Sequence, residues 1–131
     1  MKRSSIVILL LVLFFVVGSY AQDRATTTVP EIVICASVAN KQPVGIDSVF
    51  SADVKQLTCY TKIVSELDES EVSHVWFYQD KQMAKVDLKV KGKSYHTWSR
   101  KTMMPQWKGD WRVEVQDAGG KVLGQTSFKI Q

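Results

Sequence analysis

From Glu31 to the end of the chain, apolar residues recur at every second position rather than at helical spacing. Alternation of this kind over several residues is the pattern of a β-strand with one buried face. No window long enough for a helix shows a period of 3.6 residues, so the domain is predicted to be all β. We predict about seven strands, at residues 32–38, 57–63, 72–79, 83–90, 94–100, 111–115 and 122–130.

The strand at 83–90 has the clearest half-buried pattern, because apolar and polar positions alternate through most of its length. Its predicted inward residues are Ala84, Val86, Leu88 and Val90, and its predicted outward residues are Met83, Lys85, Asp87 and Lys89. In the first and second strands, the predicted inward residues are Ile32, Ile34, Ala36 and Val38, and then Leu57, Cys59, Thr61 and Ile63.

Turn-forming residues separate several of these strands, at 79–81, 91–93 and 117–120. Seven short strands joined by such turns are typical of a two-sheet antiparallel sandwich of immunoglobulin-like type. A small closed barrel is the alternative architecture.

The N-terminal residues 1–21 have the order of a secretory signal peptide. Lys2 and Arg3 give a positive start, an apolar run follows at 6–17, and small residues at 19 and 21 match a cleavage site. The apolar run is shorter than the roughly 20 residues that cross a bilayer comfortably, so we predict cleavage after Ala21 and no stable membrane span thereafter. The protein is predicted to be exported, to the periplasm or the extracellular space.

The exported chain divides into a polar, threonine-rich leader at 22–30 and a single β domain at 31–131. Loss of Lys2 and Arg3 lowers the formal net charge from +4 to +2. A charge of that size, spread along the chain, is not the footprint of a nucleic-acid-binding protein. No cofactor motif is present in the sequence, and no cofactor is predicted.

Several short motifs occur in order along the domain: NKQPVG at 40–45, YT at 60–61, HVW at 74–76, WSRKTMMPQWKGDW at 98–111 and DAGGKVL at 117–123. In this set the chain resembles the bacterial family called domain of unknown function 2914, over residues 31–131. The resemblance implies a small exported or membrane-tethered β domain with no assigned activity.

The two cysteines, Cys35 and Cys59, are an even number in a chain that is predicted to be exported, which favours a disulfide. The alternation argues against it, because Cys35 falls on the outward side of its strand and Cys59 on the inward side. Side chains on opposite faces of one sheet cannot bridge, since a disulfide requires Cβ atoms about 4 Å apart. A β-bulge in one of the two strands would bring both cysteines to the same face of the sheet, so both alternatives stay open.

His74 is predicted to lie near one end of the sandwich and to hydrogen-bond a neighbouring strand. The alternative is an acid-base or nucleophilic set of His74 with His96, Ser99 and Lys101, as in an envelope hydrolase. A soft-metal site built on His74, His96, Met103 and Met104 is a further alternative, although no pair among these residues has a metal-binding spacing.

Two charged segments need no specific ligand. The acidic run at 65–71 lacks the alternating oxygen ligands and central glycine of a calcium loop, so it is predicted to be a solvated connection. A basic stripe lies along and just beyond the strand at 83–90. Lysines on an edge strand prevent sheets from pairing with one another, and contact with an anionic surface is the alternative. The stripe consists of Lys85, Lys89, Lys91 and Lys93.

The segment 95–111 contains three of the four tryptophans and is the strongest candidate for a binding surface. Trp111 shares a predicted inward face with its strand neighbours, whereas Trp98 points opposite to Tyr95, so one of that pair faces outward. Trp107 lies in a loop and either faces a partner or folds back to cap the sandwich. Tryptophan and arginine carry much of the energy in protein contacts. The candidate surface is His74, Tyr95, Trp98, Arg100, Lys101, Trp107 and Lys108.

The sequence therefore predicts a non-enzymatic, exported β-sandwich domain that binds a protein or a glycan of the cell envelope. A hydrolase or a metal carrier is the alternative from another functional class. A purely structural domain that docks through its basic strand is the third.

Overall fold

The computed structural model describes residues 26–131, and these residues form β-strands and connections without a helix. The predicted signal peptide at 1–21 and the first part of the predicted leader lie outside the described residues. In the described part of the chain, no helix is long and apolar enough to cross a membrane. The strands are β1 (Thr27–Cys35), β2 (Ser37–Ala39), β3 (Gln42–Val44), β4 (Val49–Phe50), β5 (Gln56–Ser65), β6 (Glu69–Tyr78), β7 (Lys81–Lys91), β8 (Ser94–Thr102), β9 (Gly109–Asp117) and β10 (Val122–Ile130).

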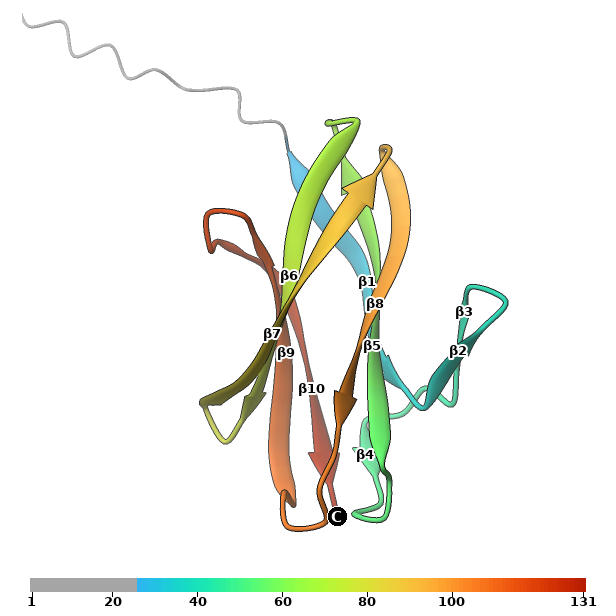
Figure 1. Cartoon of the computed structure of the whole chain (residues 1–131), viewed down its shortest axis with the longest axis vertical. Coiled ribbons are helices and arrows are strands. Elements are labelled where there is room, and N and C mark those ends of the chain that lie inside the picture. Colours follow the sequence, from blue (N-terminus) through green and yellow to red (C-terminus); the bar gives the residue numbers. More distant parts are fainter. Residues whose placement is uncertain (1–25) are drawn as a thin grey trace, which may run out of the picture.

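The strands form two packed sheets and one separate hairpin (Figure 1). The small sheet has the order β1-β5-β8, and the large sheet has the order β4-β10-β9-β6-β7. All pairings are antiparallel except that of β4 with β10. This arrangement confirms the predicted all-β, immunoglobulin-like sandwich.

The core lies between the sheets and consists of the inward residues of both. One cluster is centred on three aromatic residues of the large sheet, Trp76, Trp111 and Phe128. Trp111 stacks on Phe128 at 5.9 Å between ring centroids, and Trp76 meets Phe128 edge to face at 6.2 Å. A second cluster at the other end of the sandwich contains Ile63, Val72, Val90 and Val115. The alternation predicted for β5 and for the inward side of β7 is confirmed.

Two predicted boundaries and one predicted side-chain direction are wrong, and backbone irregularities explain two of these three differences. β1 begins at Thr27, so the last four residues of the predicted leader are in the sheet. Pro30 cannot donate a ladder hydrogen bond, but it lies where the β1–β5 register shifts, and a bulge tolerates proline. Met83 was predicted outward but packs against the core, because the β6–β7 register shifts between Trp76 and Phe77. The acidic run is only partly a connection, since β6 already begins at Glu69.

The first predicted strand is also too long at its end, because the chain leaves the small sheet after Cys35. Ala36 is exposed rather than inward, and Val38 belongs to a hairpin formed by β2 and β3. The hairpin turn consists of Asn40 and Lys41, both with positive φ, as a two-residue turn of type I′ requires. Figure 1 shows this hairpin projecting from the small-sheet side of the sandwich. The chain then reaches the edge of the large sheet as β4.

Cys35 and Cys59 are free thiols, so the structure resolves the open question against a disulfide. Cys59 packs in the core, whereas the thiol of Cys35, on the other face of the sheet, donates a hydrogen bond to the Thr58 carbonyl at 3.7 Å. The prediction that the two cysteines lie on opposite faces of the sheet is therefore confirmed. Burial raises the pKa of the Cys59 thiol well above its ordinary value, which disfavours the reactive thiolate.

Because neither cysteine side chain has exposed surface, both thiols should be unreactive in the folded domain. We expect no labelling by a thiol reagent under native, non-reducing conditions and two labelled thiols per molecule after unfolding in urea. Mass spectrometry of the labelled protein measures both numbers. Fewer than two labelled thiols in the unfolded, never-reduced protein would contradict the structure.

Candidate functional site

A hydrogen-bonded chain centred on His74 joins the two sheets inside the core. His74 comes from β6 of the large sheet, and its Nδ1 lies 2.7 Å from Oγ of Ser99 on β8 of the small sheet. Its Nε2 lies 3.1 Å from Oγ1 of Thr61 on β5. Trp76 Nε1 donates to Ser99 Oγ at 3.1 Å, and Thr61 Oγ1 donates to the carbonyl of Thr97 at 3.0 Å.

The partners fix the protonation state of His74. The single hydroxyl proton of Thr61 is donated to Thr97, so Thr61 accepts a hydrogen bond from Nε2–H of His74. Nδ1 is then an acceptor and takes the hydroxyl proton of Ser99. The ring is a neutral tautomer with both nitrogens satisfied. Burial lowers the pKa of His74 to about 4, since a charged imidazole is disfavoured in the core.

This arrangement has the parts of a serine–histidine pair but not its accessibility. His74 has no exposed surface, and Ser99 is 4% exposed. A base must reach the proton of a bound substrate, and a sealed ring cannot do so. The chain of hydrogen bonds therefore joins two sheets rather than activating a nucleophile, which agrees with the structural interpretation of His74. The prediction was wrong in two details, because His74 lies across the sandwich rather than at its end, and its partners are on the opposite sheet rather than on a neighbouring strand.

Lys101 and Trp107 meet at one end of the sandwich, away from this network. The Lys101 side chain is on the inward face of β8, and its Nζ lies 4.8 Å from the centroid of the Trp107 ring. Partial burial lowers the pKa of Lys101. Trp107 folds back onto Trp111 at 6.0 Å between centroids, and Trp111 Nε1 donates to the Trp107 carbonyl at 3.0 Å. Of the two alternatives for Trp107, the cap is the one that the structure shows, and Lys108 beside it is exposed.

The candidate soft-metal ligands are dispersed. His74 is in the core, with both ring nitrogens hydrogen-bonded. His96 is on the outside of the small sheet, Met103 is buried in the core cluster and Met104 is 41% exposed. Within residues 26–131, no three His, Cys, Asp or Glu side chains are grouped as metal ligands. The structure does not bring the predicted metal set together.

The outer face of the small sheet carries a stack of three aromatic rings, which we call the aromatic face. The Tyr60 ring lies between His96 and Trp98, with centroid distances of 5.5 and 5.9 Å and interplanar angles of 30° and 17°. Tyr60 and Trp98 are directly opposite each other on β5 and β8. Tyr60 Oη donates to the carbonyl of Lys41 at 2.8 Å, which fastens the tip of the β2–β3 hairpin to this face. Tyr60 is consequently only 1% exposed although it lies outside the core.

Cations surround the stack on the aromatic face. Lys62 is opposite His96, and Arg100 follows Trp98 on the same side of β8. Neither Lys62 nor Arg100 makes an ion pair with residues of the described part of the chain. Glu31, opposite Lys62 on β1, is the acidic residue in this register. The aromatic face thus combines flat apolar rings with two cations, of which Lys62 has an acidic residue opposite it and Arg100 has Thr58 opposite it.

Of the predicted surface residues, only Trp98 and Arg100 come together on this face. Tyr95 is on the inward side of β8 and packs against the second core cluster. His74, Lys101 and Trp107 lie in the core or at the sandwich end, as described above. Tyr60, Lys62 and His96 were missed as members of one surface, because only the β5–β8 register brings them beside Trp98.

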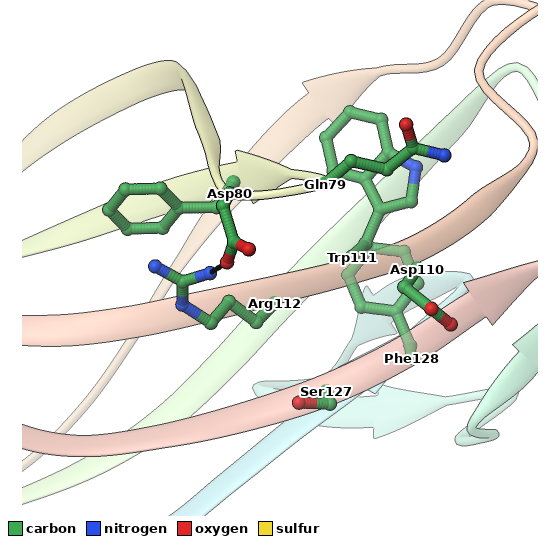
Figure 2. A pocket seen from close by; sticks show the side chains of 8 residues that line it. Gln79, Asp80, Asp110, Trp111, Arg112, Ser127 and Phe128 are labelled. Atoms are coloured by element: carbon green, nitrogen blue, oxygen red, sulfur yellow. Dashed lines mark hydrogen bonds and ion pairs between the residues drawn. The ribbon is translucent and has the colours of Figure 1, made fainter.

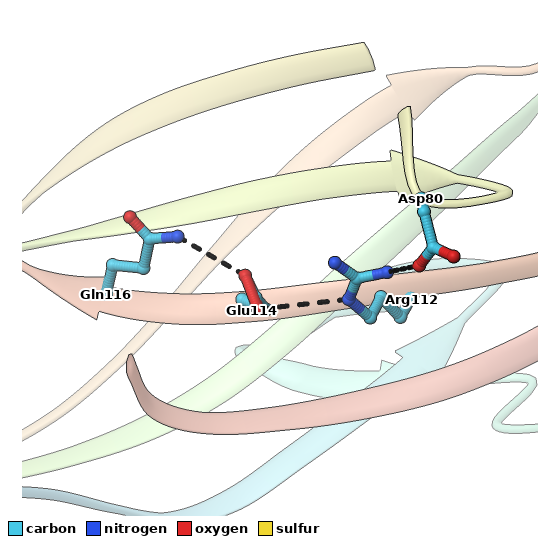
Figure 3. A network of polar contacts seen from close by, with 4 residues as sticks. All are labelled: Asp80, Arg112, Glu114 and Gln116. Carbon is cyan, nitrogen blue, oxygen red and sulfur yellow. Dashed lines mark hydrogen bonds and ion pairs between the residues drawn. The ribbon is translucent and has the colours of Figure 1, made fainter. Parts of the chain in front are cut away.

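The outer face of the large sheet has a different character, because its charges are largely compensated. Figure 3 shows a row in which Arg112 lies between Asp80 and Glu114, and Gln116 donates to Glu114 at 3.3 Å. On β7, which is the predicted edge strand, Lys89 and Lys91 are opposite Glu71 and Glu69 of β6. Opposite charges directly across a pair of strands favour a solvated role for the basic stripe.

A hollow of about 520 Å³ lies at one end of this outer face, beside the β6–β7 turn. The guanidinium of Arg112 lies over the ring of Phe77, and Figure 2 shows its pairing with the carboxylate of Asp80. We call it the Arg112 hollow. It is lined by Phe77, Gln79, Asp80, Asp110, Trp111, Arg112, Ser127 and Phe128.

A comparison with known families matches one continuous segment of the chain, and this segment contains most of the residues of the sites described so far. The family model described as Protein of unknown function (DUF2914) matches residues 69–130, which is β6 to β10. The predicted resemblance to DUF2914 is therefore confirmed for residues 69–130, whereas the rest of the predicted range, residues 31–68 and residue 131, lies outside the match. The DUF2914 match contains His74, Ser99 and Trp98, whereas Tyr60 and the β2–β3 hairpin precede it. Over this segment the chain is similar to the DUF2914 family, whose description assigns no function, and the fold that contains it is a β-sandwich. No curated protein matches the chain.

Solved structures show the same fold at very low sequence identity. One is a β-glucosidase, EmGH1, from Erythrobacter marinus, at 5% identity and a TM-score of 0.54. Another is β-glucosidase 3B from Thermotoga neapolitana in complex with α-D-glucose, at 9% identity and a TM-score of 0.51. The matches cover 82% and 81% of this chain but only 16% of each glucosidase chain. They support the fold and nothing about activity.

Proposed function

We propose that this domain is a non-enzymatic interaction module that binds a protein of the cell envelope through the aromatic face. The observation that carries the proposal is the stack of Tyr60 between His96 and Trp98 on a sheet face that is outside the core. Tyrosine, tryptophan and arginine are the residue types that dominate binding energy at protein interfaces. The envelope location rests on the predicted signal peptide.

The charge of Arg100 on this face indicates the chemistry of the partner. Arg100 has no ion-pair partner within residues 26–131 and no acidic residue opposite it, so an acidic surface would compensate its charge. A protein suits the face better than a glycan does. Sugar rings stack on exposed aromatic faces, whereas both faces of the Tyr60 ring are covered by its neighbours.

The competing explanation is that the aromatic stack only stabilises the fold. A pair of double variants distinguishes this explanation from partner binding. We expect Trp98→Ala/Arg100→Ala to reduce partner capture from an envelope extract by about tenfold or more, measured by quantitative mass spectrometry. The matched control, Lys85→Ala/Lys89→Ala, changes the other outer face and should retain capture. The control variant should unfold within about 1 kcal/mol of the wild type, because surface charges contribute little stability. The Trp98 variant should lose about 1–3 kcal/mol, because the half-buried Trp98 ring covers Tyr60, and its capture is measured where the domain is folded.

Each outcome has a distinct meaning. Capture lost only in the control variant would show that the domain docks through its basic strand, and the proposal would be wrong. Capture retained by both variants would restrict the aromatic stack to a stabilising role. Elution of a bound glycan rather than a protein, dependent on Trp98, would overturn the choice of partner.

A further inference from the structure

The Arg112 hollow is a second candidate site, on the outer face of the large sheet. We propose that Arg112 is the receptor for a carboxylate group of a ligand, and that Asp80 occupies this receptor in the free domain. The proposal is independent of the aromatic face. Three features of the hollow carry it: a guanidinium that is already fixed in place, an internal carboxylate that is easily displaced, and space beside both.

Arg112 is held in position by contacts that do not use its whole hydrogen-bonding capacity. Its guanidinium carbon lies 4.0 Å from the centroid of the Phe77 ring, and its Nε lies 3.8 Å from a Glu114 oxygen. The side chain is 28% exposed, so the group is partly desolvated but open on one side. Stacking on an aromatic ring and a fixed fork of donors are the usual means by which arginine recognises carboxylates.

The contact with Asp80 uses only one of the two terminal nitrogens of the Arg112 guanidinium. One carboxylate oxygen of Asp80 accepts from Nη1, and Nη2 has no acceptor among the described residues. A free carboxylate can accept from both nitrogens in parallel, which is the stronger arrangement. Asp80 therefore resembles a ligand group that is present but not optimally bound.

The Asp80 side chain is also on a turn that can change at low cost. Gln79 and Asp80 form the two-residue β6–β7 turn with φ of 47° and 67°, a left-handed conformation that aspartate tolerates and that is strained for glutamine. Asp80 is 91% exposed, and a surface ion pair of this kind contributes little to stability. Strained turns of this type recur where proteins bind ligands.

The hollow gives a ligand room and further polar partners. Its volume of about 520 Å³ is within the range of small-molecule sites. Gln79 and Ser127 line it with an amide and a hydroxyl group that can donate to a carboxylate, as Figure 2 shows. The Asp110 carboxylate in the same lining does not bind an anion, and it is paired with Lys129 at 3.6 Å between Oδ1 and Nζ. The shared chemistry of the ligand is a planar carboxylate, carried either by a small organic acid or by the free C-terminus of a peptide.

The test uses sodium acetate as the probe and the Nε–H resonance of Arg112 as the readout, by NMR of the described domain within the full chain. Sodium chloride at equal ionic strength and acetamide serve as controls for charge and shape. We expect acetate to shift the Arg112 resonance saturably, and Asp80→Gly to bind acetate about fivefold tighter, because an occupied receptor raises the apparent dissociation constant. Glycine also suits the second position of this turn, so the variant should fold.

Two further variants make the result specific. Asp110→Asn removes the same charge from the same hollow without freeing Arg112 and should change the affinity by less than about twofold. Arg112→Lys keeps the charge but loses the fork and should abolish saturable binding. Equal tightening by Asp80→Gly and Asp110→Asn, or no saturable shift in Asp80→Gly, would overturn the proposal.

The source of the carboxylate is resolved by a second titration. An N-acetylated tripeptide with a free C-terminus is compared with the same peptide as its C-terminal amide. Tighter binding of the free acid than of acetate assigns the hollow to a peptide terminus, and binding of acetate alone assigns it to small acids. Equal binding of the acid and the amide would contradict carboxylate recognition.

Discussion

Replacing His74 by alanine should lower the free energy of unfolding by about 4 kcal/mol. The substitution leaves a cavity in a core where His74 has no exposed surface. It also removes one hydrogen bond each from Ser99 and Thr61, which keep their bonds to Trp76 and Thr97. The hydroxyl proton of Ser99 loses its acceptor, and a buried donor without an acceptor costs about 1–3 kcal/mol. Urea unfolding followed by tryptophan fluorescence measures the change.

His96 is the matched control, because it is the other histidine of the chain and lies on the aromatic face. His96→Ala should cost at most about 1 kcal/mol, the value of one exposed stacking contact. A loss below about 1.5 kcal/mol for His74→Ala would contradict the account of His74 as the link between the sheets. If His74→Ala does not fold, Ser99→Ala, which removes one hydrogen bond and one small group, should fold with an intermediate loss.

The second large effect is a loss of stability in mild acid. The pKa of His74 is about 4 in the folded domain and about 6.5 in an unfolded chain. Between these values the unfolded state binds a proton that the folded state does not, so unfolding is favoured as the pH falls. The contribution is fully present above about pH 6.5 and is lost toward pH 4. The difference of pKa corresponds to about 3 kcal/mol.

Urea unfolding at intervals from pH 7.5 to 4 measures this effect. The same pH series on Ser99→Ala is informative, because this variant keeps His74 but removes the hydrogen-bond partner of its Nδ1. NMR of the His74 ring tests the cause directly: its Cε1–H shift should remain that of the neutral form down to about pH 5. A His74 ring that titrates above pH 6 would show that the imidazole is hydrated, and the sealed network would be wrong.

The sequence was sufficient for the long strands, because each has one buried face and therefore alternates. β5, β7 and β10 were predicted within three residues at either end. The β2–β3 hairpin was missed because its turn, Asn40-Lys41, lacks the glycine that usually marks a type I′ turn, and its strands have three residues each. Pro30 misled the prediction of the first boundary for a local reason, the bulge in β1.

The site was harder to predict, because a surface is made by neighbours on different strands. The alternation of side chains along one strand showed that Trp98 and Tyr95 face opposite ways. It did not show that Trp98 stacks on Tyr60 of the neighbouring strand. His74 was correctly assigned to a structural hydrogen bond, whereas its partners, one on each of two strands of the other sheet, could not be deduced from spacing. Arg112 and Asp80 are 32 residues apart and were not considered, since only the strand register joins them.

The central claim is that the aromatic face binds a partner, and site-specific photo-crosslinking in living cells that make the protein tests it most directly. Reactive groups at Ser94 and Thr102, two exposed outward positions at the ends of β8, bracket the stack without removing it. A reactive group at Gln125, exposed on the outer face of the large sheet, is the control. The account predicts one protein adduct common to the two β8 positions and absent at Gln125. Adducts only at Gln125, or none at any position while the domain is folded and abundant, would contradict it.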